Sequence, residues 1–260
     1  MCRHSAFFAM AIAIVWLSSP TYAVVDDFQD GDYTSNPVWT LVNSPYGIVG
    51  VAADPIRSGN LAVRLHGSEE AHVGLDTSVS VPYAGFDASM EFLTTNASDY
   101  YPVLEVRNGT VRIAVGFARD YPQYGDLVPT LYLGEYVEGA DWVNHGVTTA
   151  NISANTWYKL HMWHEAATGR VHGELRTLDD SVLAAVDFLP GTALSSQTPI
   201  SALRIATQEY TWQYLDNVSL SSTPVNASPV ADAGANVVIN SADQSLTIIQ
   251  GTASDPDGDA

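Results

Sequence analysis

Short segments in which large apolar residues alternate with small or polar residues recur along most of the chain. In the clearest of them, residues 111–118, every second residue is large and apolar, namely Val111, Ile113, Val115 and Phe117. Successive side chains of a β-strand point to opposite faces, so this alternation predicts strands with one buried and one exposed face. Helical periodicity is nearly absent between Val24 and Leu220. We therefore expect an all-β fold of stacked antiparallel sheets.

The β-rich runs are short and are separated by turn residues. They begin at Leu61, Thr110, Pro129, Thr156, Arg170 and Ser201. Turn-forming pairs lie between them, as at Asn108-Gly109, Thr168-Gly169 and Asp179-Asp180. Residues 120–126 and 140–154 have few apolar pairs, and we expect both segments to be loops.

The first 23 residues have the layout of a secretory signal peptide, with Arg3 before an apolar run from Ala6 to Leu17 and small residues up to Ala23. The apolar run is shorter than the roughly 20 residues that span a membrane, so we expect no membrane insertion after cleavage. Cys2 is the single cysteine and would leave with this segment. The sequence thus predicts a secreted or cell-surface protein without disulfides.

The chain carries a formal net charge of −19 at pH 7. Such a charge repels phosphate backbones and anionic lipids, which argues against nucleic-acid and membrane-surface partners. It is compatible with surroundings rich in divalent cations.

The C-terminal residues differ in character from the rest of the chain. A Ser/Pro-rich linker at 223–229 leads into residues 230–260, which are too few to close a core alone. We therefore expect further domains beyond Ala260. The motifs SPVADAG, SLTIIQGTAS and DPDGD in this region resemble the start of PKD-type and cadherin-like Ig repeats. The predicted divisions are a signal peptide at 1–23, a β-sandwich at 24–222, the linker, and an incomplete Ig-like β segment at 230–260.

Three motifs of residues 24–222 resemble laminin-G-like and concanavalin-like jelly rolls and, more loosely, carbohydrate-binding modules. They are DDFQDGDYTSNPVW from Asp26, NTWYKLHMW from Asn155 and YLDNVSL from Tyr214. The resemblance implies an antiparallel jelly-roll β-sandwich in which the first and last strands are neighbours.

The same resemblance implies a structural Ca²⁺ ion where the first and last strands meet. The matching acids are Asp27, Asp30, Asp32 and Asp216. Calcium takes about six to eight oxygen ligands, which carboxylates and backbone carbonyls of one turn can supply. A second candidate calcium site is the DPDGD loop, with Asp255, Asp257 and Asp259 at alternate positions. Both clusters are equally compatible with plain acidic turns.

Aromatic and polar residues that share strand faces form a candidate glycan groove to which a loop adds Trp142. Sugar rings pack their C–H faces on aromatic rings while polar groups bind the hydroxyls. The candidates are Tyr132, Tyr136, Trp142, His161, Trp163, His172, Glu174, Arg204 and Gln208. The alternative is that the aromatic residues fill the core.

Motifs for catalysis are absent from the sequence: there is no ExDxxE, GxSxG or HExxH pattern. His161 and His164 are three residues apart on a predicted strand and would face opposite sides, which argues against a shared metal. We therefore favour a non-catalytic binding module for polysaccharide or for matrix and cell-surface glycans. The alternatives are a calcium-rigidified adhesion segment and a polysaccharide hydrolase or lyase of jelly-roll type.

Overall fold

The computed structural model describes residues 21–42, 47–67, 73–95, 101–109, 111–118, 129–137, 142–190, 199–207, 212–222, 230–232 and 252–254. Every regular element in these ranges is a β-strand, and all the strand pairs are antiparallel. The described residues accordingly include no helix that could cross a membrane. The all-β prediction is confirmed.

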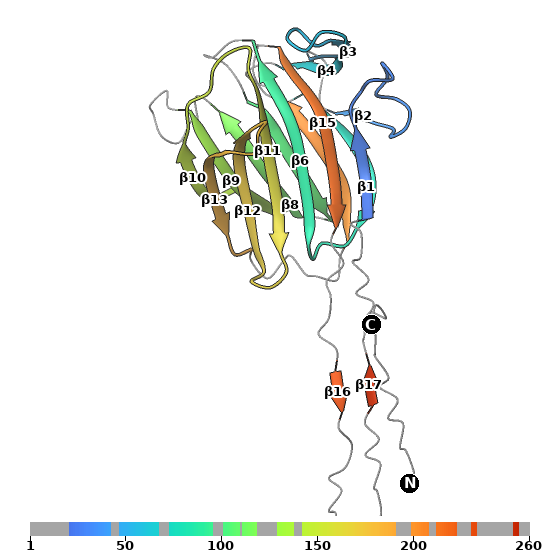
Figure 1. The fold of residues 1–260 in the computed structure, drawn as a ribbon, viewed down its shortest axis with the longest axis vertical. Coiled ribbons are helices and arrows are strands. Elements are labelled where there is room, and N and C mark those ends of the chain that lie inside the picture. The colour runs from blue at the N-terminus through green and yellow to red at the C-terminus, as the bar shows by residue number, and fades with distance from the viewer. Residues whose placement is uncertain are drawn as a thin grey trace, which may run out of the picture. The chain divides into compact units, whose positions relative to one another are not determined.

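One sheet has eight strands (Figure 1). Its order is β13 (Val182–Phe188), β12 (Arg170–Thr177), β11 (Trp157–Glu165), β6 (Phe86–Thr94), β15 (Gln213–Ser222), β4 (Leu61–His66) and β3 (Ile48–Ala53), with β1 (Thr21–Asp26) also paired to β15. Figure 1 shows β1 alongside β15, so the first and last strands of the sandwich are neighbours, as expected.

The other sheet has seven strands. Its order is β10 (Val143–Thr149), β9 (Thr130–Val137), β8 (Val111–Ala118), β7 (Val103–Asn108), β14 (Ile200–Thr207), β5 (Val73–Val81) and β2 (Thr40–Val42). The expectation of a loop at 140–154 is wrong, because β10 pairs with β9 in this segment. As an edge strand, β10 bonds to one neighbour only and needs few apolar residues.

The core lies between the two sheets and is built from the alternate apolar residues predicted from the sequence. Leu160 and Met162 of β11 and Ile113 and Val115 of β8 all belong to it. Their chain neighbours therefore form the outer faces of the sandwich. Gly109 and Gly169 have positive φ angles, as their predicted turns require.

The chain divides into two compact units. Residues 20–223 form the sandwich, and its β1 includes Thr21, Tyr22 and Ala23 from the segment predicted to be a signal peptide. In the other unit, β16 (Val230–Asp232) pairs antiparallel with β17 (Thr252–Ser254). The assignment of residues 230–260 to an Ig-like repeat stays a prediction.

Candidate functional site

Two rows of side chains cross the outer face of the seven-stranded sheet, each made of residues in direct register on neighbouring strands. From β5 to β9, the first row is Asp76, Arg204, Glu105, Ala114 and Gly134. The second row is Gly74, Ala206, Val103, Gly116 and Tyr132. Charged residues thus gather over β5, β14 and β7, aromatic residues lie over β9 and β10, and the small residues of β8 separate them.

The aromatic residues of this face lie directly on glycines. A Cβ atom on Gly116 would come within 2.1 Å of the Tyr132 hydroxyl, and one on Gly134 would come within 2.4 Å of Trp142. Tyr101 and Trp142 flank Tyr132, with ring centroids 5.6 and 6.3 Å from it. Tyr132 is 4% exposed, whereas Tyr101 and Trp142 are half-buried and present ring surface to solvent.

The charged residues form a network of ion pairs. Arg204 donates to both Asp76 oxygens, at 2.5 and 2.9 Å. Arg107 Nε donates to Glu105 at 2.7 Å, and its Nη1 lies 3.2 Å from Asp76. Burial opposes the charged form of Arg204, but the Asp76 hydrogen bonds and the nearby carboxylates outweigh it and raise the pKa of Arg204. The network therefore presents fixed, oriented polar groups beside the aromatic cluster.

The outer face of the eight-stranded sheet carries different aromatic residues, which stack on one another. Trp163 stacks against His161 and His172, at centroid distances of 4.6 and 4.7 Å, and is half-buried. His161 Nε2 lies 3.1 Å from Asp87, and Arg176 donates to Glu174 at 2.5 Å. The indole of Trp163 is therefore already engaged by two imidazoles. His164 points the other way, into the core, where its Nδ1 accepts from the Gly85 N–H, so the two histidines do not share a face, as predicted.

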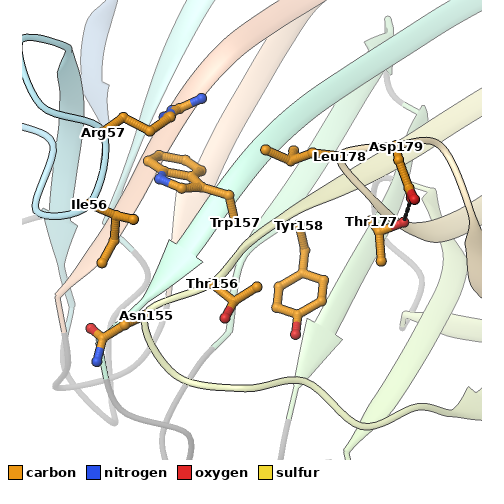
Figure 2. Close-up of a pocket in the computed structure, with 9 residues that line it drawn as sticks. All are labelled: Ile56, Arg57, Asn155, Thr156, Trp157, Tyr158, Thr177, Leu178 and Asp179. Carbon is orange, nitrogen blue, oxygen red and sulfur yellow. Dashed lines mark hydrogen bonds between the residues drawn. The ribbon is translucent and has the colours of Figure 1, made fainter.

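A pocket of about 500 Å³ lies at one end of this second face (Figure 2). Its wall includes the exposed side chains of Ile56 and Leu178 and two buried aromatic residues, Trp157 and Tyr158. Figure 2 shows Arg57 beside Trp157, and its guanidinium lies 3.9 Å from the ring centroid. Trp157 is 5% exposed, so this pocket offers less free aromatic surface than the seven-stranded sheet does.

Arg57 also joins three carboxylates. Its nitrogen atoms lie 2.5 Å from Asp54, 2.8 Å from Glu91 and 2.5 Å from Asp216. Asp216 is 1% exposed, and its burial raises its pKa to about 7. The hydrogen bond from the Asn217 N–H and the attraction of Arg57 lower this pKa, but burial outweighs them, and the charges of Glu91 and Asp27 raise it further.

The acids proposed for calcium at the start and end of the sandwich accept hydrogen bonds from the protein itself, and calcium binding by them stays a prediction. Among the described residues, no three His, Cys, Asp or Glu side chains gather to hold an ion. Asp27, Asp30 and Asp32 accept hydrogen bonds from backbone N–H groups of their own turns, and Asp216 is held by Arg57. Within the motif at residues 26–39, Asp26 accepts hydrogen bonds from the Phe28 N–H and from Trp39 Nε1. Asp255, Asp257 and Asp259 lie outside the described residues.

The structure divides the predicted glycan residues between the two outer faces. The seven-stranded sheet carries Tyr132, Tyr136, Trp142 and Arg204. The eight-stranded sheet carries His161, Trp163, His172 and Glu174. Gln208 lies outside the described residues.

Sequence reasoning missed several residues of the seven-stranded face, namely Asp76, Tyr101, Glu105, Arg107 and Arg112. The alternation of residues 103–107 already places Glu105 and Arg107 on one side of a strand. This alternation does not indicate that β14 and β5, which are distant in sequence, bring Arg204 and Asp76 beside Glu105 and Arg107.

No protein-family model matches the sequence. No curated protein matches it either. Solved structures of similar fold do exist. The CBM2 module of the evolved Dit protein of Lactobacillus casei BL23 phage J-1 is 9% identical, with a TM-score of 0.53 over 80% of this chain and 98% of that one. The exoplasmic/lumenal domain of VIP36, in a Ca²⁺/Man2-bound form, is 11% identical, with a TM-score of 0.53 over 79% and 89%.

Peanut lectin, solved with a nine-residue peptide, is 14% identical, with a TM-score of 0.52 over 77% of this chain and 97% of that one. These neighbours are a carbohydrate-binding module and lectins. At such low identity they establish the fold, and they confirm the predicted jelly-roll sandwich.

Proposed function

We propose that this chain is a sugar-binding module of a secreted or cell-surface multidomain protein, and that the glycan binds on the outer face of the seven-stranded sheet. One observation carries the proposal: half-buried aromatic rings and ion-paired polar groups lie on either side of a strip of small residues. Binding sites typically combine apolar ring surface with a few fixed polar groups.

In the proposed complex, sugar rings pack on Tyr101 and Trp142, while Arg204, Asp76 and Glu105 bind hydroxyl groups. Ala114 and Gly116 of β8 lie between these two groups, and the Tyr132 ring covers Gly116. The ion pairs hold the polar groups in place before the ligand arrives, which lowers the entropic cost of binding. The Man2-bound form of VIP36, of similar fold, is in keeping with this proposal.

A binding role is favoured over glycoside hydrolysis. Hydrolysis needs two carboxyl groups that flank the scissile bond, one as acid and one as base or nucleophile. The two carboxylates described on this face, Asp76 and Glu105, are both tied to arginines. They are therefore suited to orienting a ligand.

The proposal is tested by screening the full chain on a glycan array and titrating the best ligand against variants. We expect Trp142→Ala to weaken binding by about tenfold or more, because it removes the half-buried indole ring on which a sugar is proposed to pack. Trp163→Ala, on the opposite sheet, is the matched control and should bind as the parent chain does. Thermal unfolding of both variants checks that they are folded. A chain that binds no glycan on the array would overturn the proposal.

Calcium binding by Asp27, Asp30, Asp32 and Asp216 stays a hypothesis, and the proposed complex does not require it. Calcium binding by Asp255, Asp257 and Asp259 remains a hypothesis about the C-terminal segment.

A further inference from the structure

Two arginines face each other on the proposed binding face. Arg107 of β7 and Arg112 of β8 are direct partners in the strand register, and both alternate with residues of the core. Like charges directly opposite each other on a sheet are destabilising. The presence of this arginine pair therefore indicates a role other than stabilisation of the fold.

The two arginines are unequally compensated. Arg107 is paired with Glu105 and Asp76. Arg112 makes no ion pair with any described residue, and its guanidinium lies 5.0 Å from the ring centroid of Tyr136. An aromatic ring orients a guanidinium without neutralising it. Among the described residues, therefore, no carboxylate neutralises the positive charge of Arg112.

Arg107 also has an unused donor. Its Nη2 is buried and finds no hydrogen-bond partner within the described part of the chain. Leaving a buried donor unpaired costs on the order of 1–3 kcal/mol, more for a charged group. A ligand oxygen at this position would recover that cost.

The charge of this face contrasts with that of the chain. The described outer face of the seven-stranded sheet has three arginines, at 107, 112 and 204, against two carboxylates, Asp76 and Glu105. The whole chain carries a net charge of −19. The described part of this face thus has a small excess of positive charge, whereas the chain as a whole is strongly acidic.

From this geometry we infer that the ligand is an acidic glycan, and that a uronic acid carboxylate binds at Arg107 and Arg112 beside Tyr136. This inference rests on the proposed function and names its ligand class. A planar carboxylate matches the fork of a guanidinium and accepts charge-assisted hydrogen bonds from it. It relieves the repulsion between the two arginines and supplies an acceptor for Arg107 Nη2. Neighbouring sugars then extend over β8 towards Tyr101 and Trp142.

The test compares acidic polysaccharides with the same polymers after chemical reduction of their carboxyl groups. Polygalacturonate, alginate and hyaluronan, each in native and carboxyl-reduced form, are titrated against the full chain. We expect at least one native polymer to bind about tenfold or more tightly than its reduced form. Arg112→Gln should abolish most of that preference. Arg176→Gln, on the opposite sheet, is the matched control and should keep the preference.

The outcomes separate the two proposals. Equal binding of native and reduced polymers, with Arg112→Gln unchanged, would overturn the acidic ligand and leave glycan binding in place. Failure to bind any polymer, acidic or neutral, would overturn both. If Arg112→Gln does not fold, as judged by circular dichroism, the comparison of native and reduced polymers on the parent chain decides the matter.

Discussion

Arg57 shows how one side chain can organise a surface. One guanidinium serves three carboxylates and covers an indole, so the group as a whole keeps excess negative charge. Part of this ion-pair group is local in sequence, because Asp54 accepts hydrogen bonds from the N–H groups of Ile56 and Arg57. Glu91 and Asp216 come from strands 34 and 159 residues away. Burial makes the ionised form least favourable at Asp216, whose pKa is raised.

The raised pKa of Asp216 predicts a pH dependence of stability. Its pKa of about 7 in the folded protein lies above the ordinary value of 3.8. The stabilising contribution of its proton is therefore complete below about pH 3.8 and is lost as the pH rises through about 7. Asp216→Asn stays neutral throughout. We expect the free energy of unfolding of this variant, relative to the parent chain, to rise by about 1 kcal/mol or more between pH 5.5 and pH 8.5.

Urea unfolding at both pH values measures the effect, and Asp187→Asn, at an exposed ion pair, is the control. A relative stability of Asp216→Asn that falls with rising pH would mean that Arg57 favours the ionised form.

Among the elements, β15 has a particular role because its two halves have different neighbours. Gln213, Tyr214 and Leu215 pair with β4, and residues 218–222 pair with β1. The register against β6 shifts between Asp216 and Ser219, where Asn217 has a φ angle of 46°. The bulge lets one strand serve two partners along the same edge.

This backbone conformation makes residue 217 sensitive to its side chain. Asn217→Val places a β-branched residue at positive φ and should lose about 1–3 kcal/mol of stability relative to Asn217→Gly. Both variants lose the hydrogen bond from Asn217 to Glu91, so their difference reports the backbone alone. Urea unfolding of the two variants gives this difference. Equal stability of the two would show that the bulge relaxes to an ordinary strand conformation.

The sequence predicted strands well wherever alternation was strong, as in β8 and β11. It missed β10, whose pairing depends on β9 and not on its own apolar content. For the candidate site, the sequence assigned Tyr132 and Arg204 to strand faces and Trp142 to a loop, but could not say that His161 and Trp163 belong to the other sheet. Which sheet a strand joins is set by pairings between distant segments, and alternation carries no information about them.

For the molecule as a whole, contacts between described residues of the protein itself join the two ends of the sandwich. The β1–β15 ladder joins its two ends, and Arg57 holds Asp216. A metal ion stabilises a protein only if it binds the folded state. The described residues contain no cluster of His, Cys, Asp or Glu side chains that could hold one.

We therefore expect the unfolding temperature of the sandwich to change by less than about 1 °C when EDTA or millimolar Ca²⁺ is added. Tryptophan fluorescence is the appropriate signal, because residues 224–260 contain no tryptophan. Buffer with Mg²⁺ in place of Ca²⁺ is the control. Destabilisation by EDTA that Ca²⁺ reverses would reveal an ion bound to the sandwich.

The pairing of Thr21 with Ser222 means that the polypeptide enters and leaves the sandwich at one point. Tension applied through those two ends would load the β1–β15 ladder in an unzipping geometry, so that its hydrogen bonds yield one after another and not together. A module attached in this way makes a weak mechanical link within a taut chain, but it is well suited to be carried as a side branch on a host protein.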